Sequence, residues 1–272
     1  MLAKRTVTAV FLAALGLPAI ILGGIPYFII IAFFLGVAAW EYVVLFRATR
    51  FEPSAVLTVG GVLALLVTRA YRAHFPELAE TVFTFLILLA LTYHLLAYER
   101  GRDLAASDFA VTVGGIAYLG WIGAYLVDLR NLPDGLWWLL LVLPSAWLAD
   151  TGAYFIGIRW GRHRLSPRLS PKKSWEGYWA GVVTGTLGGV LFAWLWHRFG
   201  GLEVTLVEGA VLGFVLSILT TLGDLGESMF KRQAGLKDSS NLFPGHGGAF
   251  DRIDSWLWAA VLGYYMIRWF LL

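Results

Sequence analysis

Apolar residues follow one another in long runs along this chain, and short polar segments separate the runs. A helix needs about 20 residues to cross the hydrocarbon core of a bilayer. Nine runs reach roughly that length, at about 6–24, 26–46, 54–72, 78–98, 108–127, 136–158, 175–197, 204–230 and 252–271. The period-two alternation of strands is absent, and lipid requires backbone groups to pair within each segment. The pattern therefore predicts an all-α polytopic membrane protein with about nine transmembrane helices.

Composition supports the same class. Hydrophobic residues make up 58% of the chain and charged residues 14%, whereas soluble domains have about 45–50% and 25%. The mean hydropathy is +0.71. No polar stretch is long enough for a soluble appendage, so we expect residues 1–272 to form a single integral membrane domain. The two most charged connections lie within about 150–177 and 224–254, and we expect the catalytic segments there.

The distribution of Lys and Arg predicts the orientation. If the N-terminus is cytoplasmic, the inner segments carry sixteen of the twenty-one basic residues. Cytoplasmic loops of membrane proteins are enriched in Lys and Arg. We therefore expect the N-terminus inside, the C-terminus outside and the charged connections at the cytoplasmic face, in what we take to be a prokaryotic plasma membrane.

Two classes of chemistry are disfavoured. The chain has no cysteine, which excludes disulfides and thiolate metal sites. An extended soluble basic surface is also missing, so no nucleic-acid partner is expected; the inner basic residues suit lipid headgroups or a nucleotide instead.

Ionisable residues inside apolar runs are costly and usually face a partner or a cavity. The candidates are Glu41, Asp150, Asp224 and Glu227. Asp224 and Glu227 are three residues apart and share one helix face. Asp251 and Asp254 repeat this spacing where the last run begins. The alternative is structural: the first pair would bind a nearby Arg, and the second would cap a helix N-terminus.

The segment "KDSSNLFPGHGGAFDRID" follows the first acid pair, contains the second and leads into the last run. Four basic residues lie in or just before this segment and bring positive charge near the acids: Lys231, Arg232, Lys237 and Arg252. A triphosphate with Mg²⁺ would reconcile the two sets, because carboxylates hold the metal and the bases neutralise phosphate. Gly247 and Gly248 would let backbone N–H groups approach phosphate, and His246 would orient a substrate group.

The second charged connection contains "DTGAY" and "SPKKSWEG". Asp150 would form a wall of the cavity, and a phosphate or lipid headgroup would meet Ser170, Lys172, Lys173, Ser174 and Glu176. Two alternatives remain open: the bases are ordinary inner-face loop charges, and Glu176 caps the following helix. Gly177, Gly181, Gly185 and Gly189 recur at every fourth position of that helix, and they predict close helix packing.

These residues carry a family resemblance. The run "SMFKRQAGLKDSSNLFPGHGGAFDRIDS", Ser228 to Ser255, resembles the signature of phosphatidate cytidylyltransferases, also called CDP-diacylglycerol synthases. "DTGAY" and "SPKKSWEG" are similar to other segments of that family, whose polytopic helical layout would cover the whole chain. Ser240 and Ala249 depart from the family pattern, which bears on local loop geometry and packing.

The resemblance implies a reaction that depends on Mg²⁺, in which CTP and phosphatidate give CDP-diacylglycerol and pyrophosphate. It also allows for a second cation beside the Mg²⁺ and for a homodimer. It implies that Asp224 and Asp251 hold metal. From the residues we add Glu227 and Asp254 to the metal shell. We expect catalytic roles for Asp224, Asp251, Lys231, Arg232 and Lys237, and substrate contacts for Asp150, Ser170, Lys172, Lys173, Ser174, Glu176, Ser228, Asp238, His246, Gly247, Gly248 and Arg252. The site would open sideways to membrane lipids.

Two alternatives come from other classes. A related membrane enzyme that uses CTP, such as an ether-lipid cytidylyltransferase or a polyprenol kinase, would share much of this chemistry. A cation-coupled transporter would also place acids in helices, but it predicts a path to the outside, and the acids here cluster toward the inner half.

Overall fold

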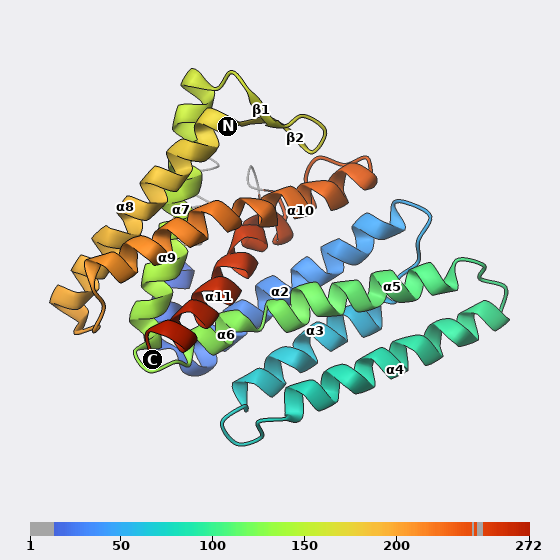
Figure 1. The fold of residues 1–272 in the computed structure, drawn as a ribbon. Helices are drawn as coiled ribbons and strands as arrows, with labels where there is room; N and C mark the ends of the chain where they lie inside the picture. The colour runs from blue at the N-terminus through green and yellow to red at the C-terminus, as the bar shows by residue number, and fades with distance from the viewer. Residues whose placement is uncertain (1–13, 241, 244–246) are drawn as a thin grey trace. The chain divides into compact units, whose positions relative to one another are not determined.

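The computed structural model of the protein describes residues 14–240, 242–243 and 247–272, and most of them are helical (Figure 1). Residues 14–22 are helical. The helices that follow are α2 (Gly24–Arg47), α3 (Ala55–Ala70), α4 (Leu78–Glu99), α5 (Ala105–Gly115), the π-helix η1 (Ile116–Ile122), α6 (Tyr125–Arg130), α7 (Gly135–Trp160), α8 (Trp175–Gly200), α9 (Leu206–Leu219), α10 (Thr221–Gln233) and α11 (Phe250–Phe270). Strands β1 (Arg164–Ser166) and β2 (Ser170–Ser174) form an antiparallel hairpin. The all-α polytopic class is confirmed.

Six helical stretches of the described residues are long and apolar enough to cross a membrane: Gly24–Arg47, Leu78–Glu99, Ala105–Arg130, Gly135–Trp160, Trp175–Gly200 and Leu206–Gln233. The third predicted run is the shorter apolar helix α3, and the last is α11. The first run lies partly outside the described residues. The count of nine and the placement of the termini stay predictions.

The predicted run 204–230 is two helices, because a turn at Thr220 separates α9 from α10. The Thr220 hydroxyl donates to the Leu216 carbonyl, 2.8 Å away, and the Gly223 N–H donates to the Thr220 carbonyl in a tighter three-residue turn. A bond to the carbonyl three residues back belongs to a 3₁₀-type turn, whereas the α-helix ladder runs four residues back. The polar half of the run therefore becomes a separate helix, α10, which carries Asp224 and Glu227.

By internal contacts the described chain divides into two compact units. The first unit is Met1–Asp128 with Phe230–Ile253, and the second is Leu129–Met229 with Asp254–Leu272. Each unit is built from segments that are distant in the sequence. The prediction of a single membrane domain stays a prediction.

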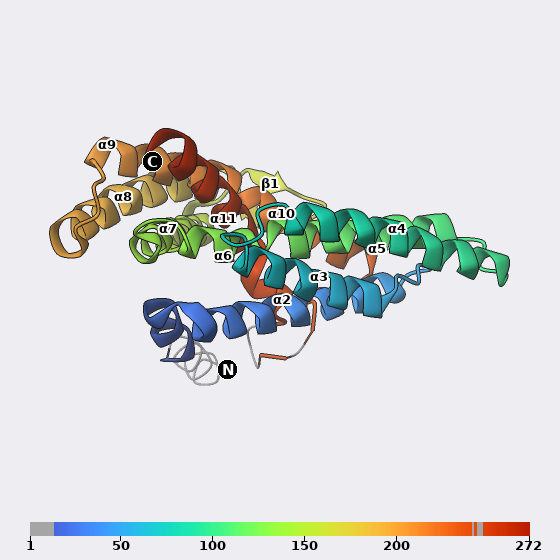
Figure 2. The same cartoon turned by 90° about the horizontal axis from the view of Figure 1, so that it is seen from below.

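In the first unit, helices α2, α3, α4 and α5 pack side by side, as Figures 1 and 2 both show. Two buried carboxylates of this unit are paired with arginines. The Arg69 guanidinium forms an ion pair with Asp128, and the two side chains are only 2% and 5% exposed. Near the other ends of these helices, Arg102 Nε donates to Asp108, 2.7 Å away, and this bond raises the pKa of the Arg102 guanidinium.

In the second unit, α8 packs between α7 and α9. Its glycines allow the close approach: a Cβ at Gly181 would lie 2.8 Å from the Ala149 carbonyl oxygen of α7, and one at Gly189 would lie 3.0 Å from the Gly213 Cα of α9. Small residues at such crossings let backbones touch. The predicted packing role of this glycine series is confirmed.

Candidate active site

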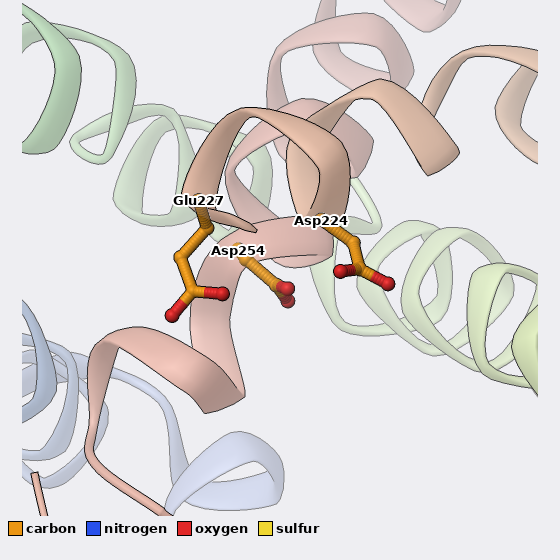
Figure 3. Close-up of side chains that lie close together, drawn as sticks. All are labelled: Asp224, Glu227 and Asp254. Atoms are coloured by element: carbon orange, nitrogen blue, oxygen red, sulfur yellow. The ribbon is translucent and has the colours of Figure 1, made fainter. Parts of the chain in front are cut away.

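Three carboxylates of the second unit lie together on α10 and α11 (Figure 3). Asp224 and Glu227 come from α10 and Asp254 comes from α11, and one oxygen from each lies within 4.8 Å of the others. Glu227 is fully buried, at 0% exposure. Figure 3 shows the Asp254 carboxylate between the other two. These are three of the four predicted metal ligands, and we call them the acidic group.

Close packing of α10 against α11 brings the acidic group together. A Cβ at Gly223 would lie 2.5 Å from the Asp254 carbonyl oxygen and 2.7 Å from the Trp258 ring. Only a glycine fits there, so the backbone of α10 approaches α11 one residue before Asp224. The spacing of three residues then places Asp224 and Glu227 on one helix face.

A cation from the β-hairpin faces the acidic group. Lys173, on β2, forms an ion pair with Asp224, and both side chains are partly exposed, at 26% and 34%. Asp150, on α7, lies close enough to Lys173 and Asp224 to interact electrostatically with both. The predicted residues Asp150 and Lys173 are thus brought to the acidic group. The partner of Asp224 in this ion pair is a lysine, whereas the structural alternative expected an Arg.

Other residues of "SPKKSWEG" fix the hairpin to α8. The Ser174 side chain caps α8 by accepting the Gly177 N–H at 3.2 Å. Glu176 accepts the backbone N–H of Arg162 at 3.1 Å and contacts the His163 ring at 2.5 Å. Glu176 therefore holds the start of the hairpin, while Ser174 is the cap. Lys172 is exposed and Ser170 is half-buried, and their substrate contacts stay predictions.

The first unit holds a second cluster around Asp251, the fourth predicted metal ligand. Lys231 Nζ donates to Asp251 Oδ1 at 2.6 Å. The other oxygen, Oδ2, accepts the Ser239 N–H at 2.9 Å, the Ser239 hydroxyl at 2.8 Å and the Gly248 N–H at 2.8 Å. Asp251 thus connects three segments: α10 through Lys231, the loop through Ser239, and the residues just before α11 through Gly248. Its assignment as a metal ligand stays a prediction.

The remaining predicted residues differ in their placement. Ser228 lies on α10 with its hydroxyl 3.4 Å from Asp224. Arg232 donates to the Leu236 carbonyl at 3.0 Å. Lys237 and Asp238 are exposed, and Arg252 is half-buried in the first turn of α11. Gly247 has a positive φ of 79°. His246 lies outside the described residues. Substrate contacts at these positions stay predictions.

Two residues gained no role from the sequence. Glu41 is an acid within an apolar run, which marks it as a candidate but names no partner. Its carboxylate accepts the N–H groups of Ala249 and Phe250, at 3.0 and 2.8 Å. Ser239 contacts both Glu41 and Asp251, and nothing in the local sequence distinguishes it from the serine beside it.

The acidic group suits a hard divalent cation. Carboxylate oxygens are the ligands that Mg²⁺ and Ca²⁺ prefer. At an effective dielectric constant of about 20, two unit charges 4.8 Å apart repel by about 3.5 kcal/mol. Lys173 offsets part of this repulsion, and the closeness of three carboxylates favours a bound cation.

The chain matches the sequence model of the cytidylyltransferase family over residues 3–270. It is 35% identical to the phosphatidate cytidylyltransferase of Synechocystis sp. over 291 residues, covering 97% of this chain and 96% of the relative. It is 36% identical to the protein of that name in Pseudomonas aeruginosa, with 99% and 97% covered. The Bacillus subtilis protein of that name is 30% identical, with 98% of each covered.

Proposed function

Because the chain belongs to the cytidylyltransferase family, we propose that it transfers the cytidylyl group of CTP to phosphatidate, giving CDP-diacylglycerol and pyrophosphate. The near full-length similarity to three proteins named phosphatidate cytidylyltransferase supports this substrate. The observation that carries the chemistry is the acidic group of Asp224, Glu227 and Asp254 with Lys173 beside it. The protein is an enzyme of the membrane, and the proposed acceptor is itself a membrane lipid.

The acidic group would hold Mg²⁺, which when bound neutralises phosphate oxygens and orients them. A phosphatidate oxygen forms a bond to the α-phosphorus of CTP, and the bond from that phosphorus to the bridging oxygen of the β-phosphate breaks. Phosphatidate is already anionic near neutral pH, so the reaction needs little help from a general base. It needs two anions placed in line and their charge neutralised.

The basic residues would meet these anions. Lys173 lies beside the acidic group, on a hairpin that Ser174 and Glu176 fasten to α8. Lys231 is held against Asp251 and is largely buried. We assign Lys231, Arg232, Lys237 and Arg252 to the triphosphate and the leaving pyrophosphate, and Lys172 with Lys173 to phosphatidate or CTP. The inner-face excess of Lys and Arg supports a site that faces the cytoplasm.

The test is CTP-dependent conversion of phosphatidate by purified protein in detergent, with Mg²⁺ or with EDTA. We expect conversion by the parent only with Mg²⁺, and loss of at least about 100-fold in Asp224→Asn. Asp103→Asn changes an exposed loop carboxylate and should leave the rate unchanged. Turnover of an ether lipid or an isoprenoid alcohol, with phosphatidate untouched, would overturn the proposed acceptor. A homodimer is proposed separately, and light scattering of the detergent complex tests it.

A further inference from the structure

Glu41 is a buried carboxylate of α2 that meets the beginning of α11 within the first unit. It is 3% exposed. Its Oε1 accepts the Ala249 N–H at 3.0 Å, and its Oε2 accepts the Phe250 N–H at 2.8 Å. The first N–H groups of a helix have no partner inside the helix, and they carry its positive end. Glu41 therefore caps α11 from another helix.

Two serines complete the surroundings of this carboxylate. The Ser240 hydroxyl donates to Glu41 Oε1 at 2.5 Å, and the Ser239 hydroxyl lies 2.9 Å from Oε2. The same Ser239 hydroxyl lies 2.8 Å from Asp251 Oδ2. A hydroxyl has one proton, so Ser239 donates to one carboxylate at a time and links Glu41 to Asp251.

The backbone is shaped to admit Glu41. Gly248 is buried, and a Cβ built on it would overlap both oxygens of Glu41 and the Ser239 hydroxyl. The N–H of Gly248 donates to Asp251 at 2.8 Å. One carboxylate on α2 thus fixes two serines and the first turn of α11, and Asp251 accepts from the same elements.

Resting on the function proposed above, we propose that Glu41 is a positioning residue of the reaction. It holds Ser239, Ser240 and the first turn of α11, so that Asp251 and Lys231 keep the orientation in which they act. A charge is costly inside an apolar helix, and here two backbone N–H groups and two hydroxyls lie within hydrogen-bond distance of it. Glu41 differs from a buried ion pair, because its partners are backbone N–H groups and hydroxyls. One of these hydroxyls, that of Ser239, also contacts Asp251.

The test compares Glu41→Gln with a matched control. Both oxygens of Glu41 accept hydrogen bonds. In Glu41→Gln an NH₂ group replaces one of these oxygens, and because it can only donate, it faces other donors. We expect kcat to fall about 100-fold per folded protein, with KM for CTP changed less than threefold, and Glu41→Asp to recover part of the loss. The control, Asp128→Asn, removes another buried carboxylate of the same unit, the partner of Arg69. It should lower the melting temperature and leave kcat per folded protein unchanged.

A second readout does not depend on turnover. Hydrogen–deuterium exchange of peptides that contain Ala249 and Phe250 should be at least tenfold faster in Glu41→Gln than in the parent, and unchanged in Asp128→Asn. An exchange rate equal to that of the parent in Glu41→Gln would overturn the proposal, and so would a kcat equal to that of the parent. An equal fall of kcat in Asp128→Asn would also overturn it. If Glu41→Gln does not fold, Glu41→Asp is compared in the same way. A parent that exchanges as expected but does not convert phosphatidate refutes the proposed function instead.

Discussion

Replacing Asp254 by Asn should stabilise the protein when metal is removed. Asp254 lies within 4.8 Å of the carboxylate oxygens of Asp224 and Glu227. Each ionised pair at that distance repels by about 3.5 kcal/mol at an effective dielectric constant of about 20. Lys173 and salt reduce the total, so we expect a net gain of about 1–3 kcal/mol from removing one charge.

The opposing effects of this change are smaller. A negative charge near a helix N-terminus contributes about 0.3–1 kcal/mol, and Asn loses that part. The Ser255 N–H donates to Asp254 Oδ1 at 2.6 Å, and the Asn side-chain oxygen can accept the same bond. Relief of repulsion therefore outweighs the loss. At about 2–4 °C for each kcal/mol in a chain of this size, the melting temperature in EDTA should rise by about 2–12 °C.

The assay is a thermal scan in detergent at pH 8.5, which favours ionised carboxylates, with EDTA or with Mg²⁺. The parent should gain about 2.7 kcal/mol when Mg²⁺ is at 100 times its dissociation constant, and Asp254→Asn should gain far less. Asp108→Asn is the matched control: it removes a buried carboxylate paired with Arg102 and should lower the melting temperature equally in both buffers. A lower melting temperature of Asp254→Asn in EDTA, or equal protection of variant and parent by Mg²⁺, would refute the reasoning.

Three further predictions concern the second cluster and the helix ends. Lys231→Gln and Asp251→Asn, whose side chains are 2.6 Å apart, should be non-additive in a double-variant cycle of unfolding free energies, by about 0.5–3 kcal/mol; an additive result contradicts the ion pair. Gly248→Ala should lower both stability and turnover, because its Cβ has no space, whereas Gly226→Ala has open space in α10 and should stabilise by up to about 1 kcal/mol, as chemical unfolding would measure. Thr205→Ala breaks the capping box of α9 and should cost about 0.5–2 kcal/mol; a fall in kcat per folded protein would show that this cap matters beyond stability.

The membrane class was within reach of the sequence because its cause is local. A helix crosses lipid when one continuous run is apolar and about 20 residues long, and such runs can be read without knowing their neighbours. The glycine series of α8 could be read in the same way, since its spacing of four residues is a property of one helix. The division of 204–230 at Thr220 was missed, because a polar half-helix can still lie in a run that is apolar on average.

Only part of the candidate site could be predicted from the sequence. The spacing of Asp224 and Glu227, and of Asp251 and Asp254, follows from helix geometry and could be predicted. The meeting of Asp224 with Asp254 depends on the missing side chain at Gly223, which lets α10 approach α11.

Glu41 shows most clearly what the tertiary structure alone decided. The sequence marks it as a costly charge in an apolar helix, and that charge must find partners. Its partner Ser239 is 198 positions away, and two of its other donors are backbone N–H groups, which every residue except proline possesses. Hydrogen bonds to the backbone leave no mark on residue identity, so only the packing of α2 against the first turn of α11 could reveal what this carboxylate holds.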